Sequence, residues 1–168
     1  MSQSPHSDSK WRQKLSRRLL AWFPKIARDL PWRKTTDLYR IWVSEAMLQQ
    51  TQVATVIDYY QRFTRSFPTV ASLAAASEEQ VLRHWEGLGY YRRARQLHAA
   101  AKKIVAEHDS RFPESFNEVL DLPGVGRYTA GAILSIGRDQ RLPILEANSI
   151  RVLCRLAAFR EAPASRAG

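Results

Sequence analysis

Residues 120–132 read LDLPGVGRYTAGA, and this stretch decides the fold of the chain. Two glycines flank one apolar residue, which allows a tight backbone turn. The helix predicted to follow would present its first amides and the positive end of its dipole, and such a helix start is a ready site for a phosphate group. The stretch therefore predicts a helical hairpin that clamps a DNA backbone without reading its sequence, through Gly124, Val125, Gly126 and Arg127. An ordinary connection between two helices is the alternative interpretation.

The composition indicates one folded domain with a polyanionic partner. A length of 168 residues is sufficient for one domain with its own core and too short for two ordinary ones. The 26 Lys and Arg residues exceed the 16 Asp and Glu residues, which gives a formal net charge of +10. An excess of this kind neutralises phosphates and releases their counterions. An anionic membrane surface is the weaker alternative partner.

Neither a membrane span nor a covalent cross-link is predicted. No apolar run approaches the roughly 18 residues that a span needs, and MSQSPHSDSK at 1–10 lacks the apolar core of a signal peptide. We therefore expect a soluble, cytoplasmic protein without a membrane partner. The single cysteine, Cys154, excludes an internal disulfide and cannot by itself build a zinc or iron–sulfur site. Its helical spacing from Leu153 and Leu156 favours a place in the core.

Hydrophobic periodicity predicts an all-α protein. Apolar residues that recur every three or four positions indicate helices over 11–26, 38–50, 53–67, 90–108, 127–136 and 149–159. Capping-box spacing indicates that two more begin at Ser77 and Ser115. No stretch alternates with period two, and no internal repeat is found. We expect a disordered tail at 1–9, a helical domain over 10–160 with the hairpin at about 115–137, and a second tail at 161–168.

A carboxylate within a hydrophobic helix is the first candidate for catalysis. In LYRIWVSEAMLQQTQ, residues 38–52, Glu45 projects between Leu38 and Ile41, and the opposite side of the helix is apolar as well. A carboxylate in such a helix loses solvation, which raises its pKa and suits it to donate a proton near neutral pH. A structural glutamate paired with a nearby arginine is the alternative, because structural ion pairs also perturb pKa values.

Three motifs carry a family resemblance. LPGVGRYTAGAI at 122–133 resembles the helix-hairpin-helix of the base-excision DNA glycosylases. VSEAMLQQTQV at 43–53 and WEGLGYYRRARQL at 85–97 are similar to the adenine-specific branch, the MutY family, and the likeness covers about 30–158. The resemblance implies a mostly helical glycosylase that removes adenine mispaired with 8-oxoguanine or guanine from double-stranded DNA. Such an enzyme would be associated with the nucleoid of a bacterial cell.

The resemblance assigns roles at the bond to be broken. Glu45 matches the catalytic acid that protonates adenine, and Tyr128 matches a tyrosine that helps stabilise the cationic sugar. Related bifunctional endonucleases have a lysine there, so a monofunctional enzyme is implied. Glu146 stands where the family has an aspartate that stabilises positive charge on the deoxyribose, and Asn148 matches the family residue. Asn148 is also a candidate cap for the last helix.

The resemblance also assigns contacts to the flipped base and its surroundings. Gln50, Leu88 and Tyr90 match residues that wedge into the duplex where the target base has left the stack. A core aromatic is the alternative interpretation of Tyr90. Arg28 and Trp32 match positions beside the adenine pocket.

The sequence departs from the family pattern at its end. The family continues with four cysteines that hold a 4Fe-4S cluster and with a second domain that recognises 8-oxoguanine, whereas this sequence ends AAFREAPASRAG. We therefore expect a catalytic-domain fragment or truncated gene product that lacks the cluster ligands. The apolar stripe of the first helix would then be partly uncovered and would promote self-association. A thymine glycosylase acting on G:T mismatches and a catalytically dead DNA-binding remnant stay open as alternative functions.

Overall fold

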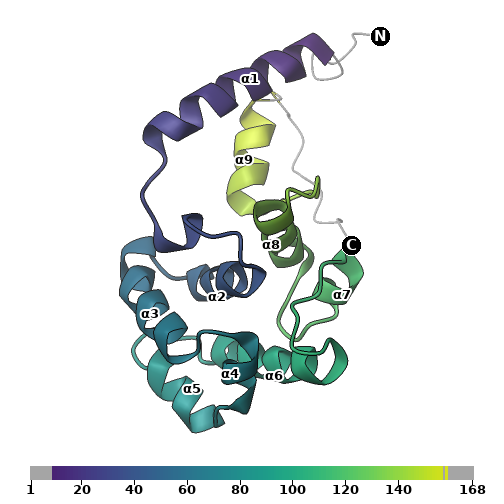
Figure 1. Cartoon of the computed structure of the whole chain (residues 1–168). Coiled ribbons are helices and arrows are strands. Elements are labelled where there is room, and N and C mark those ends of the chain that lie inside the picture. Colours follow the sequence, from purple (N-terminus) through teal and green to yellow (C-terminus); the bar gives the residue numbers. More distant parts are fainter. Residues whose placement is uncertain (1–8, 157, 159–168) are drawn as a thin grey trace. The chain divides into compact units, whose positions relative to one another are not determined.

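A computed structural model describes residues 9–156 and residue 158, and every regular element in this part of the chain is helical (Figure 1). The predicted all-α class is confirmed. The chain forms two compact units, one of Leu30–Ile144 and one of Met1–Asp29 with Leu145–Gly168. The domain boundaries predicted at 10 and 160 stay a prediction. The two predicted tails lie outside the described residues, except that Ser9 is the first residue of a helix.

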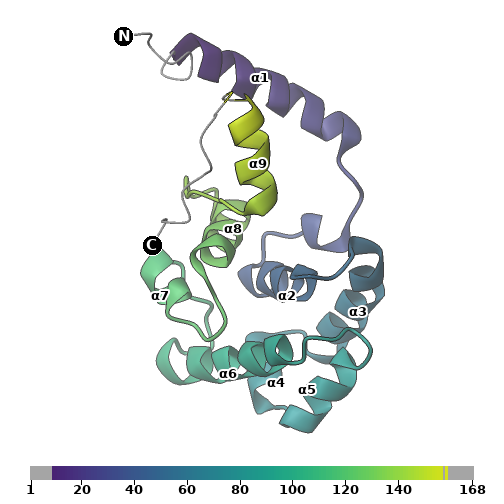
Figure 2. The ribbon, with the colours of Figure 1, turned by 180° about the vertical axis from the view of Figure 1, so that it is seen from behind.

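The larger unit is a set of short helices around a buried central helix. Its elements in chain order are η2 Pro31–Arg33, α2 Leu38–Leu48, α3 Val53–Ser66, α4 Val70–Ala75, α5 Glu78–Trp85, α6 Arg92–Glu107, α7 Phe116–Leu120 and α8 Arg127–Arg138. Helix α2 packs against α3, α6 and α8, and α6 packs in turn against α4 and α5 (Figures 1 and 2). The core therefore lies around α2.

Helix α2 is buried on nearly all sides, as its sequence predicts. Asp37 begins it, because its side chain accepts a hydrogen bond from the amide of Arg40. The buried residues are Leu38, Tyr39, Ile41, Trp42, Val43, Ser44, Ala46 and Met47. Gly137 of α8 allows the close approach of that helix, since a Cβ there would collide with the side chain of Leu38. The helix was predicted to reach Gln50 but ends at Leu48.

Side-chain capping boxes begin two of the short helices. Ser77 and Gln80 form the predicted capping box at the start of α5. Thr69 and Ser72 form a second box at the start of α4. Helix α4 was not predicted, because it is only six residues long and Ser72 replaces the usual Glu or Gln of a capping box.

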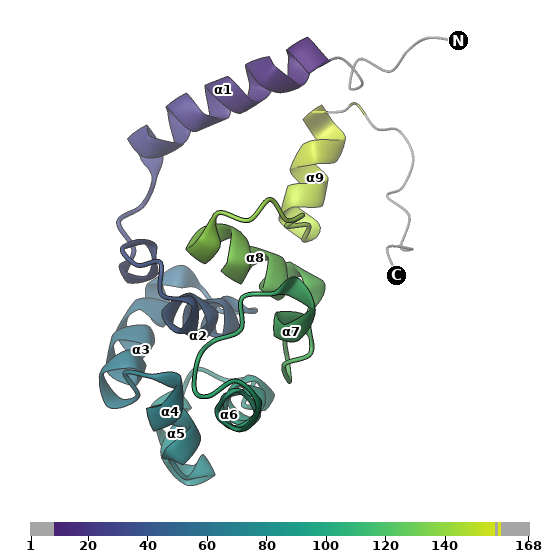
Figure 3. The same ribbon diagram turned by 45° about the vertical axis from the view of Figure 1, so that its right-hand side comes forward.

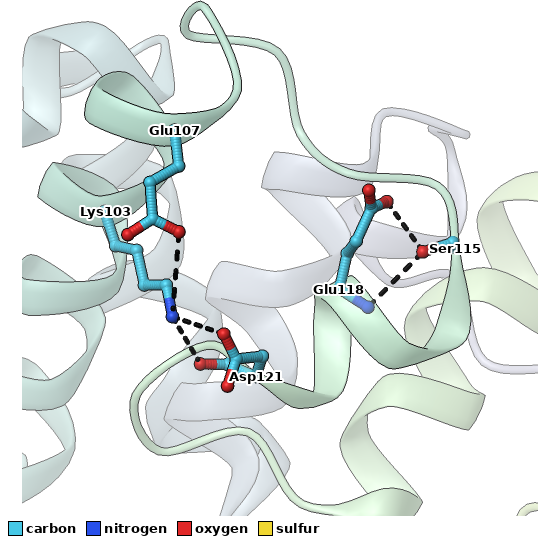
Figure 4. Close-up of polar contacts among 5 residues, drawn as sticks. All are labelled: Lys103, Glu107, Ser115, Glu118 and Asp121. Atoms are coloured by element: carbon cyan, nitrogen blue, oxygen red, sulfur yellow. Dashed lines mark hydrogen bonds and ion pairs between the residues drawn. The ribbon is translucent and has the colours of Figure 1, made fainter.

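The predicted hairpin consists of α7, a short turn and α8, and the two helices pack against each other (Figure 3). Ser115 begins α7: its hydroxyl accepts from the amide of Glu118 at 3.3 Å and donates to the Glu118 carboxylate at 2.6 Å. At the end of α7, Asp121 is bound by Lys103 of α6 through both its carboxylate and its carbonyl oxygen (Figure 4). Lys103 also lies 3.8 Å from the carboxylate of Glu107. The hairpin is thus tied to α6 just before its turn.

The smaller unit contributes two helices, α1 Ser9–Ile26 and α9 Ala147–Leu156. Neither has a fully buried residue, and Cys154 on α9 is partly buried. Among the helices in the described residues, none combines the length and apolar character needed to cross a membrane.

Candidate active site and DNA-binding surface

Glu45 is a partly buried carboxyl group on α2, between the buried residues Ser44 and Ala46. Burial raises the pKa of its carboxyl group to about 7. No charged neighbour among the described residues contributes to this shift. The alternative interpretation of Glu45 as a structural glutamate paired with an arginine is therefore wrong as far as the described residues are concerned.

The raised pKa has a direct chemical consequence. A carboxyl group with a pKa near 7 is protonated in a large fraction of molecules at neutral pH, and it regains its proton readily after giving it up. Glu45 can therefore serve as a general acid, which an exposed glutamate with its ordinary pKa of 4.5 could do only weakly at that pH.

The turn of the hairpin uses its two glycines differently. Gly124 has φ of +77°, and a Cβ there would lie 2.7 Å from the Cβ of Gln96. Gly126 has φ of −95° and precedes the first turn of α8, whose start no side chain caps. Only Gly124 needs the backbone freedom of glycine. Gly126 instead leaves open space around the start of α8.

Arg127 and Val125 differ in what they offer to a ligand. Arg127 is exposed, and its guanidinium lies 5.7 Å from the centre of the Phe116 ring of α7. Val125 is buried, and its amide donates to the carbonyl oxygen of Leu122 at 3.1 Å. Val125 thus holds the turn from inside, and its predicted contact with DNA stays a prediction.

Tyr128 lies in the first turn of α8, with 38% of its surface exposed. Helix α8 packs against α2, the helix that carries Glu45. The two residues assigned to catalysis in the larger unit therefore lie on helices in direct contact. A phenol at this position cannot form a Schiff base with a sugar, because only an amine can.

Two of the three predicted wedge residues are exposed, and their backbone has a positive φ. Gln50 follows α2 with φ of +55°, and Tyr90 precedes α6 with φ of +48°. Both side chains are exposed, with 59% for Tyr90, so the alternative of a core aromatic is wrong for Tyr90. Leu88 is only 6% exposed and packs in the core. In this conformation Leu88 supports the turn and is not presented to DNA.

The two predicted pocket residues fall in different units. Trp32 is buried, and its ring contacts that of Tyr60 edge-on at a centroid distance of 5.4 Å. Arg28 is exposed and belongs to the smaller unit. Their place beside an adenine pocket stays a prediction.

Glu146 caps α9. Its carboxylate accepts hydrogen bonds from the amides of Asn148 at 3.0 Å and Ser149 at 3.2 Å, and its own amide donates to the Ser149 hydroxyl at 2.8 Å. This reciprocal arrangement is a capping box with glutamate in the first position. The prediction that Asn148 caps the helix is wrong, because Asn148 lies inside α9 and its side-chain amide donates to Glu146 instead.

Sequence reasoning missed Arg93, one of the few charged residues in the core, with 8% exposed. It stands in YYRRARQL, where Arg92 and Arg95 are exposed. The spacing of apolar residues could have indicated its burial, because Arg93 precedes Leu97 by four residues and therefore lies on the apolar face of α6.

The sequence pattern of the HhH-GPD superfamily of base excision DNA repair proteins matches residues 43–167. This chain belongs to that superfamily. The resemblance to its adenine-specific branch is confirmed by similarity to curated relatives. An adenine DNA glycosylase of Rattus norvegicus is 52% identical in an alignment 160 positions long, which covers 89% of this chain and 31% of the relative. One of Buchnera aphidicola is 45% identical over 141 residues, 83% of this chain and 41% of the relative.

The chain thus spans well under half the length of these superfamily members. Among solved structures, a thermostable thymine-DNA glycosylase matches with a TM-score of 0.80 and 28% identity, over 86% of this chain and 67% of the other. An endonuclease III–DNA complex matches with a TM-score of 0.73 and 19% identity, over 95% of this chain and 72% of the other, and shows the fold alone.

The cluster implied by the adenine-specific branch does not fit this chain. A 4Fe-4S cluster takes four thiolate ligands, and the sequence contains one cysteine. Within the described residues, no three His, Cys, Asp or Glu side chains are placed to hold a metal ion. The residues of this chain therefore do not build the cluster site.

Proposed function

We propose that this chain is the base-excising part of an adenine DNA glycosylase, a monofunctional hydrolase that removes adenine mispaired with 8-oxoguanine or guanine. The observation that carries the proposal is Glu45, a partly buried carboxyl group without a charged partner among the described residues and with a pKa of about 7. The similarity to several adenine DNA glycosylases over most of the chain supports adenine as the base.

The proposed reaction begins with a proton transfer. Protonated Glu45 donates its proton to a ring nitrogen of the flipped adenine, and the N-glycosidic bond then breaks with both bonding electrons leaving on the base. The sugar is left as an oxocarbenium cation. Water adds to its anomeric carbon and loses a proton, which restores Glu45, and the products are free adenine and an abasic site.

Two side chains are proposed to stabilise the cationic sugar. The phenol oxygen of Tyr128 would face the developing positive charge, and the carboxylate of Glu146 would attract it. Glu146 already accepts hydrogen bonds from the start of α9, so part of its charge is balanced by that helix. We expect its contribution to be smaller than that of a free carboxylate.

The proposed partner is double-stranded DNA that contains a mispaired adenine. The exposed Arg127, the uncapped start of α8 and the net charge of +10 support contact with phosphates. An enzyme with this substrate would work at the chromosome, which in a bacterial cell is the nucleoid. We also propose that α1 mediates self-association through its exposed apolar residues.

Single-turnover adenine release from an 8-oxoguanine:adenine duplex tests the function. Glu45→Gln should abolish release and leave duplex affinity within about twofold, because the amide keeps the shape but cannot supply the proton. For the parent, the excision rate should fall as the pH rises above about 7, where Glu45 loses its proton. Adenine release at the parent rate by the Gln variant would remove Glu45 from the mechanism.

The similarity to a thymine-DNA glycosylase supports thymine removal as a second candidate function, which the same assay tests. A G:T duplex serves as the matched substrate: thymine release without adenine release would assign the chain to that activity. Duplex binding with release of neither base would make the chain a DNA-binding remnant.

A further inference from the structure

Arg93 joins two loops that are far apart in the sequence. Its Nη1 donates to the carbonyl oxygens of Ala46 at 3.0 Å and Met47 at 2.8 Å, and also to that of Gln49. Its Nη2 donates at 3.1 Å to both the Thr51 hydroxyl and the Gly89 carbonyl oxygen. One guanidinium therefore binds the end of α2, the loop after it and the turn before α6.

The carbonyl groups of Ala46 and Met47 belong to the last turn of α2, and Arg93 supplies a donor for both. The last carbonyl groups of a helix accept no hydrogen bond from an amide of the same helix. A cation near that end is also favoured by the helix dipole. A buried charge is costly unless it is paired or fully hydrogen-bonded, and the acceptors around Arg93 meet that need. The arrangement is therefore specific to a buried arginine rather than an accidental surface contact.

Each of the two loops carries one non-glycine residue in the left-handed conformation. Gln50 lies between Gln49 and Thr51, both bound by Arg93. Tyr90 directly follows Gly89, and its own carbonyl oxygen accepts from the Arg93 amide at 3.0 Å. A left-handed conformation is unfavourable for a residue other than glycine and persists only where the surrounding contacts stabilise it. Arg93 supplies that hold at both places.

We propose that Arg93 is a positioning residue for base extrusion: it locks the two loops into one rigid unit that presents Gln50 and Tyr90 together to the duplex. The inference rests on the proposed function, in which those two side chains fill the space of the flipped base. Because Arg93 also binds the carbonyl of Ala46, next to Glu45, the same contacts fix the wedge relative to the proton donor.

Lysine cannot replace this arginine fully. The guanidinium has five donors in a flat fork, whereas an ammonium group is a compact centre with three donors. Arg93→Lys should therefore keep the charge but release one of the two loops, and Arg93→Met should release both. Arg95→Met is the matched control, because Arg95 is exposed on the same helix and pairs with Glu78 at 3.0 Å.

The test compares a substrate that must be unstacked with one that need not be. Single-turnover excision is measured with an 8-oxoguanine:adenine duplex and with a single-stranded oligonucleotide that contains the same adenine. The duplex to single-strand rate ratio should fall on the order of tenfold in Arg93→Met, less in Arg93→Lys, and not in Arg95→Met. Loss of folded protein lowers both rates equally and leaves this ratio unchanged.

A fluorescence measurement separates the inference from the proposed function. 2-Aminopurine is placed next to a 2′-fluoro adenosine, which resists excision, and its emission rises when the neighbouring base leaves the stack. The parent and Arg95→Met should give this rise, and the Arg93 variants should not. An equal rise in all variants, or an unchanged rate ratio, would overturn the inference and leave the glycosylase proposal standing. A rise in the parent without excision of any adenine would overturn the proposed function, while the fluorescence series would still decide the role of Arg93.

Discussion

At the scale of single residues, Glu45 links the stability of the fold to its proposed chemistry. Its pKa of about 7 lies above the ordinary 4.5, so the folded chain holds this proton more tightly than the unfolded chain. The resulting contribution to stability is complete below about pH 4.5 and is lost as the pH rises through 7. Ionisation of Glu45 at alkaline pH thus destabilises the folded chain.

Glu45→Gln should consequently stabilise the fold above neutral pH. One pKa unit corresponds to about 1.4 kcal/mol, so the gain in the free energy of unfolding at pH 8 should be roughly 1–3 kcal/mol and should vanish near pH 4.5. Denaturant unfolding of both proteins across this pH range measures the difference. Glu86→Gln, at an exposed position, is the control and should show no such trend. A gain independent of pH would show that the benefit is not electrostatic.

Glu146 is expected to combine capping with catalysis. Glu146→Asp should raise the single-turnover excision rate or leave it level, since aspartate is the shorter family residue, and Glu146→Gln should lower it by removing the charge. Ser149→Ala removes the other half of the capping box and keeps the charge. That control should cost about 0.5–2 kcal/mol of helix stability without slowing excision. If it slows excision as much as Glu146→Gln does, Glu146 acts only through the cap.

At the scale of elements, the two glycines of the hairpin turn differ in whether alanine could replace them without backbone strain. Gly124→Ala should weaken binding to an undamaged duplex and lower the melting temperature, because alanine at φ of +77° is strained and its Cβ would meet Gln96. Gly126→Ala, at φ of −95° with open space around it, is the matched control and should stay close to the parent in stability. Equal behaviour of the two variants in duplex titrations and thermal melts would argue against the turn as the phosphate-binding element.

Helix α1 exposes a row of large apolar residues, and four of them are half exposed or more: Leu19, Leu20, Trp22 and Ile26. Contiguous apolar surface of this kind favours association. Sedimentation of the parent should therefore show concentration-dependent self-association, and a Leu20→Ser, Trp22→Ser double variant should reduce it. Gln13→Ser, an exposed polar position of the same helix, is the control. A parent that stays monomeric at high concentration would refute the prediction.

At the scale of the whole molecule, the net charge of +10 should dominate non-specific binding. Affinity for undamaged duplex should fall on the order of a hundredfold between about 50 and 200 mM salt, as expected for about four phosphate contacts. A fluorescence anisotropy titration at several salt concentrations gives the slope. Arg127→Met should make it shallower by about one contact. A flat salt dependence would exclude the phosphate backbone as the main partner surface.

Most of the helical elements could be predicted from local patterns in the sequence, and so could the position of the candidate acid Glu45 in an apolar helix. Helix periodicity and the Ser77–Gln80 capping box act over a few residues, so they can be read along the chain. The same holds for the hydrophobic surroundings of Glu45 on its own helix. The hairpin glycines were recognised too, although the sequence could not show that only Gly124 adopts a positive φ.

Which side chains are buried between elements depends on the tertiary packing and could not be read from the sequence. Arg93 is one of several arginines in its stretch of sequence, and it is buried because it binds carbonyl groups of α2 and of the turn before α6. Ala46, one of these partners, is more than 40 positions away from Arg93 in the chain. Leu88 and Trp32 are core residues for the same reason. Burial and hydrogen-bond partners are set by which helices meet in space, and contacts of that range leave no fixed spacing in the sequence.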